Sequence, residues 1–419
     1  MAVPKKKLPD TAYNTTTFLL SKQPEDFVDG HRVKIAIVGS GYTGVAVGVA
    51  ILFKVGRTGH RGGDIEERDD GVMRILDSRR GLYGRAVDSY LYSYPKGMIV
   101  AVVEWSKDTF LPWVDKGRGV KGMPRKLASE VVFIDSNEEL AKAEAEDISH
   151  AAAYLGNPKI IGTKEYTMAR DAAVCVITVG DRPQNNLDAN TLLEQNLSTF
   201  KNVIPKVCKY APNSVLLIVT APVDILSYAA MKLSGFPPHR VLGLGTFLDS
   251  CRFQYFIAQK LGISASSVQA AVICENGPTS VPIWSAVTVM GIKLKDINKD
   301  IGTKSDPESW GELHAKVIDC DNDLISRKGY RCWGIGICAA EVVDAVVRNT
   351  CVCMTVSTYL KGCRHGLEKD VYMSLPCIVG RNGIETLLRH TYTPEEQEQT
   401  EASCRTIYET QKSILQDLE

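Results

Sequence analysis

Hydrophobic residues fall in short runs that alternate with amphipathic stretches along most of the chain. The first run predicts a buried strand over residues 33–38, then a glycine turn and an apolar helix that ends near Lys54. The same alternation returns after residue 126. It predicts further strands at 130–136, 173–180, 214–220 and 240–245, and helices at 136–150, 191–210 and from Val223 onward. Strands that alternate with helices in this way indicate an α/β protein with a parallel, doubly wound sheet.

The pattern changes from Asp249 onward, where long helices are mixed with few strands. Helices are expected at 249–261, 307–328, 339–349 and 394–418, and strands near 269–274 and 371–379. This mixture predicts a separate α+β domain. The expected segments are an N-terminal arm, partly disordered, at 1–31, a dinucleotide-binding domain at 32–181, the rest of that domain at 182–245, and a C-terminal substrate domain at 246–419.

Three glycines between the first strand and its helix form a GxGxxG motif, at Gly39, Gly41 and Gly44. The motif is weak by itself, but a strand before it and a helix after it are the setting in which it binds a dinucleotide. Glycines there permit a tight turn and a close approach of the backbone to a pyrophosphate, and the helix N-terminus offers N–H groups to the negative charge. An acid is then expected about 20 residues further on, at the end of the second strand.

That acid is Asp135, but only when residues 55–126 are set aside. This stretch is rich in glycine and arginine and shows little periodicity, and its removal restores the ordinary spacing of a Rossmann unit. The segment is therefore predicted to be an insertion within the dinucleotide-binding domain. Two interpretations stay open: a surface loop in a finished fold, or a translated intervening sequence.

Composition and charge exclude several classes of partner. Hydrophobic residues make up 44% and charged residues 23%, as in an ordinary soluble protein. Lys plus Arg and Asp plus Glu both total 49, so no basic excess favours nucleic acid or an acidic membrane surface. The chain has no apolar run of membrane-spanning length and no secretory leader, which predicts a cytoplasmic protein. Its twelve cysteines lack zinc-site spacing, so no metal is expected.

Several motifs together identify a family. They include "KIAIVGSGYTG", "VVFID", "IVTAPVDILSYAAMKLSGFPPHRVLGLGTFLDSCRF", "SVPIWS", "KGYRCWGIG" and "VYMSLPCIVGRNGI". Over residues 30–54 and 127–419 the chain resembles the animal-type L-lactate dehydrogenases of the lactate/malate dehydrogenase superfamily. The resemblance implies a Rossmann NAD-binding domain with an α+β catalytic domain, a small 2-hydroxy or 2-oxo acid as substrate, and a homo-oligomer, either a dimer or a tetramer.

The cofactor-binding half of the family pattern is retained. The resemblance assigns NAD binding to Gly39, Gly41, Gly44, Asp135, Thr178, Gly180 and Arg182. Asp135 matches the acid that accepts hydrogen bonds from the adenosine ribose. Because its negative charge would repel a 2′-phosphate, NAD is favoured over NADP.

The catalytic half of the pattern is retained only in part. Asp249 and Arg252 match the aspartate that orients the catalytic histidine and the arginine that binds the substrate carboxylate. The histidine itself, which exchanges a proton with the substrate, is replaced by Asn276 in "CENGPTSVPIWS". An amide neither takes nor gives a proton near neutral pH.

Three further positions depart from the family. The mobile-loop arginine that polarises the substrate carbonyl falls on Ala189, an asparagine of the family falls on Ala221, and a substrate-facing threonine falls on Arg331. Arg331 has two interpretations: it fills the vacated pocket as a plug, or it binds a second acidic group of a different ligand.

These changes predict an NAD-binding protein related to L-lactate dehydrogenase, whose family reaction converts lactate and NAD to pyruvate and NADH, but with impaired turnover. Two alternatives remain. One is an active NAD-dependent 2-hydroxy acid oxidoreductase with an altered mechanism or substrate. The other is a structural scaffold without catalytic activity.

Overall fold

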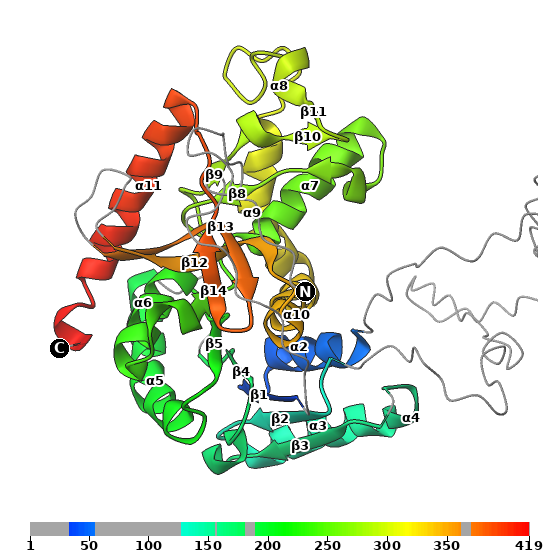
Figure 1. Ribbon diagram of the computed structural model, residues 1–419, viewed down its shortest axis with the longest axis vertical. Helices are drawn as coiled ribbons and strands as arrows, with labels where there is room; N and C mark the ends of the chain where they lie inside the picture. Colours follow the sequence, from blue (N-terminus) through cyan, green and yellow to red (C-terminus); the bar gives the residue numbers. More distant parts are fainter. Residues whose placement is uncertain (1–32, 55–126, 156, 181–188, 362–369, 419) are drawn as a thin grey trace, which may run out of the picture. The chain divides into compact units, whose positions relative to one another are not determined.

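The computed structural model describes residues 33–54, 127–155, 157–180, 189–361 and 370–418 (Figure 1). Three sequence predictions fall outside these described residues. They are the arm at 1–31, the insertion at 55–126 and the cofactor residue Arg182.

A nine-stranded sheet forms the centre of the described chain, with the strand order β14-β13-β12-β6-β5-β4-β1-β2-β3. Its parallel strands are β1 (Lys34–Val38), β2 (Glu130–Ile134), β3 (Lys159–Thr163), β4 (Val174–Ile177), β5 (Val215–Ile218) and β6 (Val241–Gly243). The order 3-2-1-4-5-6 is that of a dinucleotide-binding sheet whose ligand lies where the order reverses, between β1 and β4. The prediction of a parallel, doubly wound sheet is confirmed.

The segments on either side of the predicted insertion contribute neighbouring strands to this sheet. β1 pairs with β2 in parallel register from Lys34 opposite Glu130 to Val38 opposite Ile134. The helix α2 (Tyr42–Phe53) makes the crossover between them. β1, "KIAIV", is almost completely buried, which explains its continuous apolar run: a central parallel strand is covered on both faces.

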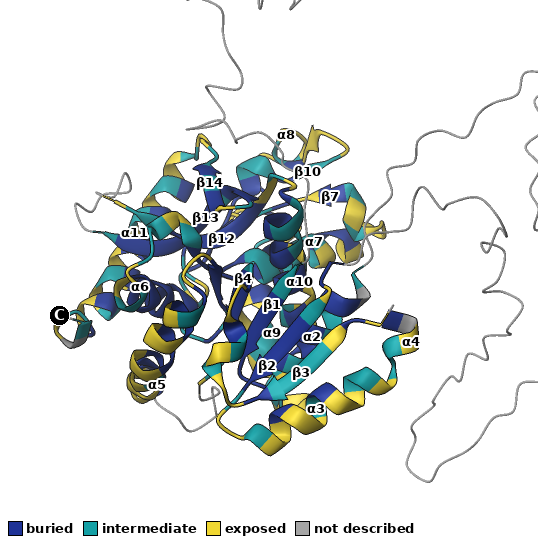
Figure 2. Ribbon diagram, turned by 60° about the horizontal axis from the view of Figure 1, so that its bottom comes forward, coloured by how far each residue is buried: buried dark blue, intermediate teal, exposed yellow. Residues whose placement is uncertain are grey.

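Helices flank the nine-stranded sheet and the shorter C-terminal strands, and several of them have exposed outer faces (Figure 2). They are α3 (Glu138–His150), α4 (Ala152–Leu155), α5 (Ala189–Tyr210), α6 (Val223–Ser234), α7 (Phe247–Leu261), α8 (Leu294–Ile297), α9 (Glu312–Lys328), α10 (Trp333–Arg348) and α11 (Pro394–Lys412). Local signals fix several helix ends. The Asn137 side chain caps α3 by accepting from Leu140 N, and Thr393 with Glu396 forms a capping box on α11.

The C-terminal strands extend the same sheet. β12 (Val352–Leu360), β13 (Val371–Gly380) and β14 (Gly383–Leu387) are antiparallel, and β12 joins the parallel part where Ser357 pairs with Gly243. The remaining strands are short: β7 (Val268–Gln269), β10 (Thr288–Val289) and β11 (Ile292–Lys293) form one sheet, and β8 (Val272–Ile273) and β9 (Val281–Pro282) another. They surround a smaller apolar core built on Phe253, Trp284 and Trp310.

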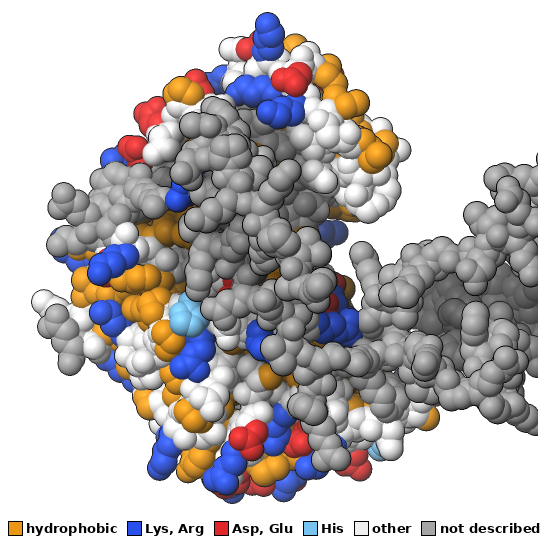
Figure 3. Space-filling model, in the orientation of Figure 1, with side chains coloured by type: hydrophobic (Ala, Val, Ile, Leu, Met, Phe, Trp, Pro, Cys, Tyr) orange, Lys and Arg blue, Asp and Glu red, His pale blue; other side chains and the backbone are white. Residues whose placement is uncertain are grey.

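Among the described residues, no helix has the length and apolar character needed to cross a membrane. On the face drawn in Figure 3, basic and acidic side chains lie among one another both around α8 at the top and around β3 and α3 at the bottom. This mixture agrees with the balanced composition of the chain.

A close contact between α2 and α10 positions both sides of the site. These helices lie side by side (Figure 1), and a Cβ on Gly336 would stand only 2.7 Å from the Ala46 backbone. α2 begins beside the glycine turn, and α10 begins two residues after Arg331. The absence of a side chain at Gly336 therefore sets how near Arg331 comes to the cofactor-binding turn.

We expect Gly336→Ala to lower the free energy of unfolding by about 1–3 kcal/mol, because the backbone of α2 cannot yield to the added methyl group. Gly334→Ala is the matched control on the same helix. There the new Cβ would meet only the end of the Leu248 side chain, at 3.1 Å, and alanine gains up to about 1 kcal/mol of helix propensity. Urea unfolding of both variants measures the difference, and equal stabilities would contradict the packing argument.

Candidate functional site

The glycine turn has the geometry that a bound pyrophosphate requires. Gly39 has a φ of +108°, and a Cβ on it would lie 2.9 Å from Thr178 Oγ1. A Cβ on Gly44 would lie 1.9 Å from the Gly39 carbonyl oxygen, so the helix packs directly on the turn. Gly41 caps the N-terminus of α2. Side chains at Gly39 or Gly44 would push the backbone away from the ligand, as the sequence motif predicts.

Asp135 connects the turn to the next helix. Its Oδ2 accepts hydrogen bonds from Ser40 N at 2.7 Å and Ser40 Oγ at 3.0 Å, and its Oδ1 accepts from Asn137 N at 2.9 Å. These contacts fix the carboxylate at the end of β2, beside the turn. A carboxylate oxygen has more than one lone pair, so these bonds leave capacity for ribose hydroxyl groups.

A cavity of about 760 Å³ lies at this end of the sheet. Six of the predicted cofactor residues line it: Gly39, Gly41, Gly44, Asp135, Thr178 and Gly180. Ala221 and Arg331 line it as well. Its volume and its position, at the carboxyl ends of the strands where their order reverses, fit a dinucleotide. The structure thus brings together every predicted cofactor residue that it describes.

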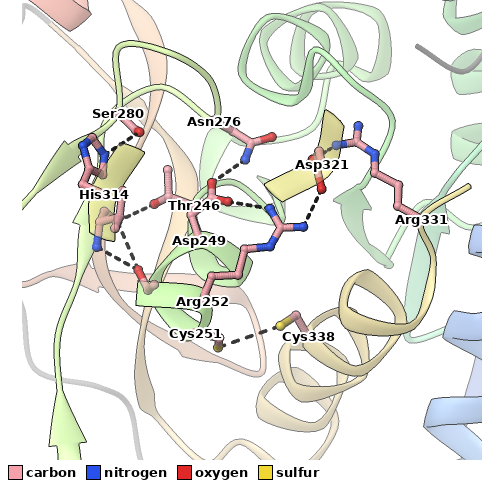
Figure 4. A network of polar contacts seen from close by, with 12 residues as sticks. Thr246, Asp249, Cys251, Arg252, Asn276, Ser280, His314, Asp321, Arg331 and Cys338 are labelled. Atoms are coloured by element: carbon pink, nitrogen blue, oxygen red, sulfur yellow. Dashed lines mark hydrogen bonds and ion pairs between the residues drawn. The ribbon is translucent and has the colours of Figure 1, made fainter. Parts of the chain in front are cut away.

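The three predicted substrate-side residues also meet (Figure 4). Asp249 and Arg252 lie one turn apart on α7, and Asn276 lies in the loop between β8 and β9. Asn276 Nδ2 donates to Asp249 Oδ2 at 2.7 Å. The Asn276 amide therefore uses the Asp249 oxygen that, by the resemblance, would orient an imidazole.

Arg252 is held by two carboxylates of the chain. Its Nη1 donates to Asp249 Oδ1 at 3.1 Å, and its Nη2 donates to Asp321 Oδ1 on α9. The other oxygen of Asp321 forms an ion pair with Arg331 Nη1. Two arginines and two aspartates form a continuous chain of ion pairs (Figure 4). Sequence reasoning did not identify Asp321, because the acid-rich run 319–323 has the pattern of a solvated helix face.

Burial shifts the pKa values of this network. It raises the pKa of Asp249 above its ordinary value, against the opposing effect of the Arg252 charge and the hydrogen bond from Asn276. Burial, with the nearby Arg252 charge, lowers the pKa of Arg331. Each charge is thus costly to remove from water, and each is compensated by a neighbour of opposite sign.

Asp224 is a second residue that sequence reasoning missed. This fully buried carboxyl on α6 accepts from Asn276 N at 2.8 Å and from Ser357 Oγ at 2.5 Å. Burial raises its pKa to about 7 in spite of these hydrogen bonds. It anchors the loop that carries Asn276 through the backbone rather than through the side chain.

Among the described residues, Asn276 rather than a histidine is hydrogen-bonded to Asp249. No histidine is among the described residues that line the cavity. His314 Nε2 lies 3.1 Å from Ser280 Oγ, and burial lowers the His314 pKa to about 4. Ala189, at the position of the family's loop arginine, is the first residue of α5.

Two protein-family models match the chain. Residues 120–243 match the NAD-binding domain of lactate/malate dehydrogenases, and residues 246–417 match the α/β C-terminal domain of the same enzymes. These matches confirm the resemblance found in the sequence motifs and confirm NAD as the cofactor.

Curated relatives agree with the family models. The chain is 41% identical to the L-lactate dehydrogenase A chain of Danio rerio over 290 residues, which cover 69% of this chain and 87% of the relative. It is 41% identical to L-lactate dehydrogenase A-like 6A of Homo sapiens over 288 residues, covering 69% and 86%. It is 40% identical to an L-lactate dehydrogenase of Petromyzon marinus over 290 residues, with the same shares.

The raised pKa of Asp224 predicts a pH dependence of stability. Between pH 3.8 and about 7 the native carboxyl keeps a proton that the unfolded chain has lost. The free energy of unfolding should therefore fall as pH rises through this window, by at most about 1.4 kcal/mol per pH unit for one group.

Asp224→Asn isolates this contribution. The amide can accept from Asn276 N and donate to Ser357 Oγ, so the contacts are preserved while the titration is removed. Urea unfolding across the window should give a shallower fall for the variant than for the natural chain. Identical pH profiles would show that Asp224 does not titrate there.

Proposed function

The chain belongs to the lactate/malate dehydrogenase family, and we propose that within it this protein binds NAD(H) but interconverts lactate and pyruvate far more slowly than ordinary members. The observation that carries the proposal is the hydrogen bond from the Asn276 amide to Asp249, at 2.7 Å. It stands where the family's chemistry needs a proton donor.

The proton step is the first difficulty. NAD, when bound, supplies or accepts the hydride, and a side chain must exchange a proton with the substrate oxygen. Asn276 can donate a hydrogen bond to a carbonyl, but it cannot move a proton near neutral pH. Its Nδ2 group is also directed to Asp249, away from that task.

Substrate placement is the second difficulty. By the resemblance, Arg252 should bind the substrate carboxylate in a two-pronged arrangement. Its Nη1 and Nη2 groups instead donate to Asp249 and Asp321. Arg331, paired with Asp321 from the other side, supports the interpretation of a plug over that of a second acid-binding group.

The size of the loss follows from general values for such groups. Removing a general acid or base lowers a rate typically by about 10²- to 10⁴-fold, or roughly 3–5 kcal/mol. Removing a cation that stabilises developing charge, as Ala189 implies, costs about 3 kcal/mol more when it acts alone. Groups that act as a unit are not additive, so the penalties are not multiplied.

NAD(H) binding is supported by different parts of the chain. The turn at Gly39, Gly41 and Gly44, the fixed carboxylate of Asp135, and the cavity between β1 and β4 involve none of the altered positions except Ala221 and Arg331 at one end. Loss of the proton donor therefore leaves the cofactor cradle unchanged.

Two alternatives are kept. The raised pKa of Asp249 favours an active enzyme of altered mechanism, because a carboxyl with a pKa nearer the working pH is a better acid or base. The ion pair with Arg252 argues against it, since protonation would break that contact. The second alternative is a scaffold that binds neither cofactor nor substrate.

The cytoplasmic location and the homo-oligomeric assembly expected from the resemblance stay predictions. One surface supports an assembly: Trp333 and Ile337 lie one turn apart on α10 and are more than half exposed. The exposed ring of Tyr42 packs on Tyr330, three residues before Trp333. Large apolar side chains that gather on a surface are typical of an interface.

A paired assay of the purified natural protein tests the proposal. We expect NADH to raise the thermal stability and to change its own fluorescence on binding, and pyruvate reduction to run at least ~10³-fold below an ordinary family member. Ordinary turnover would establish the active alternative. An unchanged melting temperature at millimolar NADH would establish the scaffold.

Reversal of the substitutions tests the cause. Asn276→His alone should recover little activity, because Ala189 leaves the carbonyl unpolarised and the ion pair with Arg331 still holds Asp321 on Arg252. Adding Ala189→Arg and Arg331→Thr should recover far more than the product of the single effects, because proton transfer, polarisation and placement act as one unit. Steady-state kinetics of the single, double and triple variants gives the comparison, and simply multiplicative gains would contradict it.

A further inference from the structure

Asp321 has the contacts of a bound carboxylate ligand. One of its oxygens accepts from Arg252 and the other pairs with Arg331, so each oxygen faces a different guanidinium group (Figure 4). The four charged side chains of the network are mostly covered: Arg252 is 13% exposed, Asp249 10%, Arg331 23% and Asp321 25%. A carboxylate placed on guanidinium groups away from water is the arrangement by which arginines bind carboxylate ligands.

The charge of the network leaves no place for another anion. Two arginines and two aspartates sum to zero, and a substrate carboxylate placed on Arg252 would be a third negative charge in a partly dry site. The substrate carboxylate would have to displace Asp321 from both arginines. Because α9 holds Asp321 at this position, the internal carboxylate competes at an effective concentration that no free ligand matches.

The cavity gives a second, independent observation. Arg331 lines the cofactor cavity, while Arg252, Asp249 and Asp321 are not among the described residues that line it. Arg331, on the wall of the cavity, thus pairs with Asp321, which in turn pairs with Arg252. A ligand arriving from the cofactor side meets Arg331 before it reaches Arg252.

We propose that Asp321 is the specificity-determining residue of this site: it occupies Arg252 as an internal carboxylate, excludes small 2-oxo and 2-hydroxy acids, and on its removal leaves a site for one such monocarboxylate. The preference for a monoanion follows from the charge count, because two arginines and Asp249 alone have a net charge of +1. The inference rests on the proposed function in one respect, the assignment of Arg252 to a substrate carboxylate.

The test is a calorimetric titration with oxamate, a monocarboxylate with the shape of pyruvate, carried out with and without saturating NADH. The natural chain should show no saturable binding. Asp321→Ala should bind oxamate saturably, with an affinity at least about tenfold above the upper limit measured for the natural chain, which corresponds to about 1.4 kcal/mol. Oxamide, which has the same shape without the charge, should bind neither protein.

Two further variants keep the result interpretable. Asp321→Asn preserves the size of the side chain and removes its charge, so it should fold where the alanine variant fails and should still gain oxamate binding. Asp323→Ala is the matched control, since Asp323 lies on the same helix but pairs with the exposed Arg327. It should behave like the natural chain.

Each outcome decides the matter. Oxamate binding by the natural chain that equals that of Asp321→Ala, or folded Asp321 variants without any gain, overturns the inference. A gain in the absence of NADH binding would support the role of Asp321 while overturning the proposed function. A protein that binds NADH but whose Asp321 variants do not gain oxamate binding would leave the proposed function intact and reject the inference.

Discussion

A charge removed from water needs an opposite charge or a set of hydrogen bonds in its place, and this constraint governs the network of Asp249, Arg252, Asp321 and Arg331. Asp249 meets it with Asn276 and Arg252, and Arg252 meets it with Asp249 and Asp321. The compensation comes entirely from within the chain. In an enzyme site, one charged group usually lacks a partner within the protein. The substrate supplies that partner, and this gives the site its affinity for the substrate. Here the protein provides every partner, so a carboxylate ligand can enter only by displacing one.

The cofactor side follows a different rule. Its backbone atoms, hydroxyl groups and one carboxylate hold the shape of the glycine turn. Thr178 Oγ1 donates to the carbonyl oxygens of Val38 and Gly39 at 3.1 Å each, and Asp135 accepts from Ser40. These bonds fix the turn without filling the cavity before it. The glycine turn and the ion-pair network can therefore coexist in one protein. Because they use different residues, cofactor binding is separable from substrate binding.

The sequence predicted most of the fold but only part of the site. The β1–α2 unit was predictable because its strand is continuously apolar and its glycines stand at fixed spacing. β12 escaped prediction, since its apolar residues alternate with cysteine, serine and threonine, and its strand character depends on pairing with β13. α10 begins at Trp333 rather than near 339, because Gly336 weakens the local helix signal but is needed against Ala46. The predicted strand 269–274 is two short strands.

The same limit explains the site residues. Asp249, Arg252 and Asn276 were found through a known motif. Asp321 lies 69 residues from its partner Arg252 along the chain, in an acid-rich run that resembles a solvated helix face. Nothing local distinguishes it from its neighbour Asp323, whose partner is the exposed Arg327. Only the packing of α9 against α7 decides which of the two acids faces inward.

The conformation of the loop that carries Asn276 does not depend on the side chain at this position. Its position is set by backbone contacts: Cys274 N donates to Ser374 O at 2.8 Å, Glu275 N to Ser403 Oγ at 3.3 Å, and Asn276 N to Asp224 Oδ2 at 2.8 Å. None of these bonds depends on the side chain at 276. That side chain needs only to compensate Asp249, and an amide does so as well as an imidazole. Stability therefore places little constraint on the identity of residue 276, whereas proton transfer under the proposed function depends on it, so a substitution there can leave the fold intact.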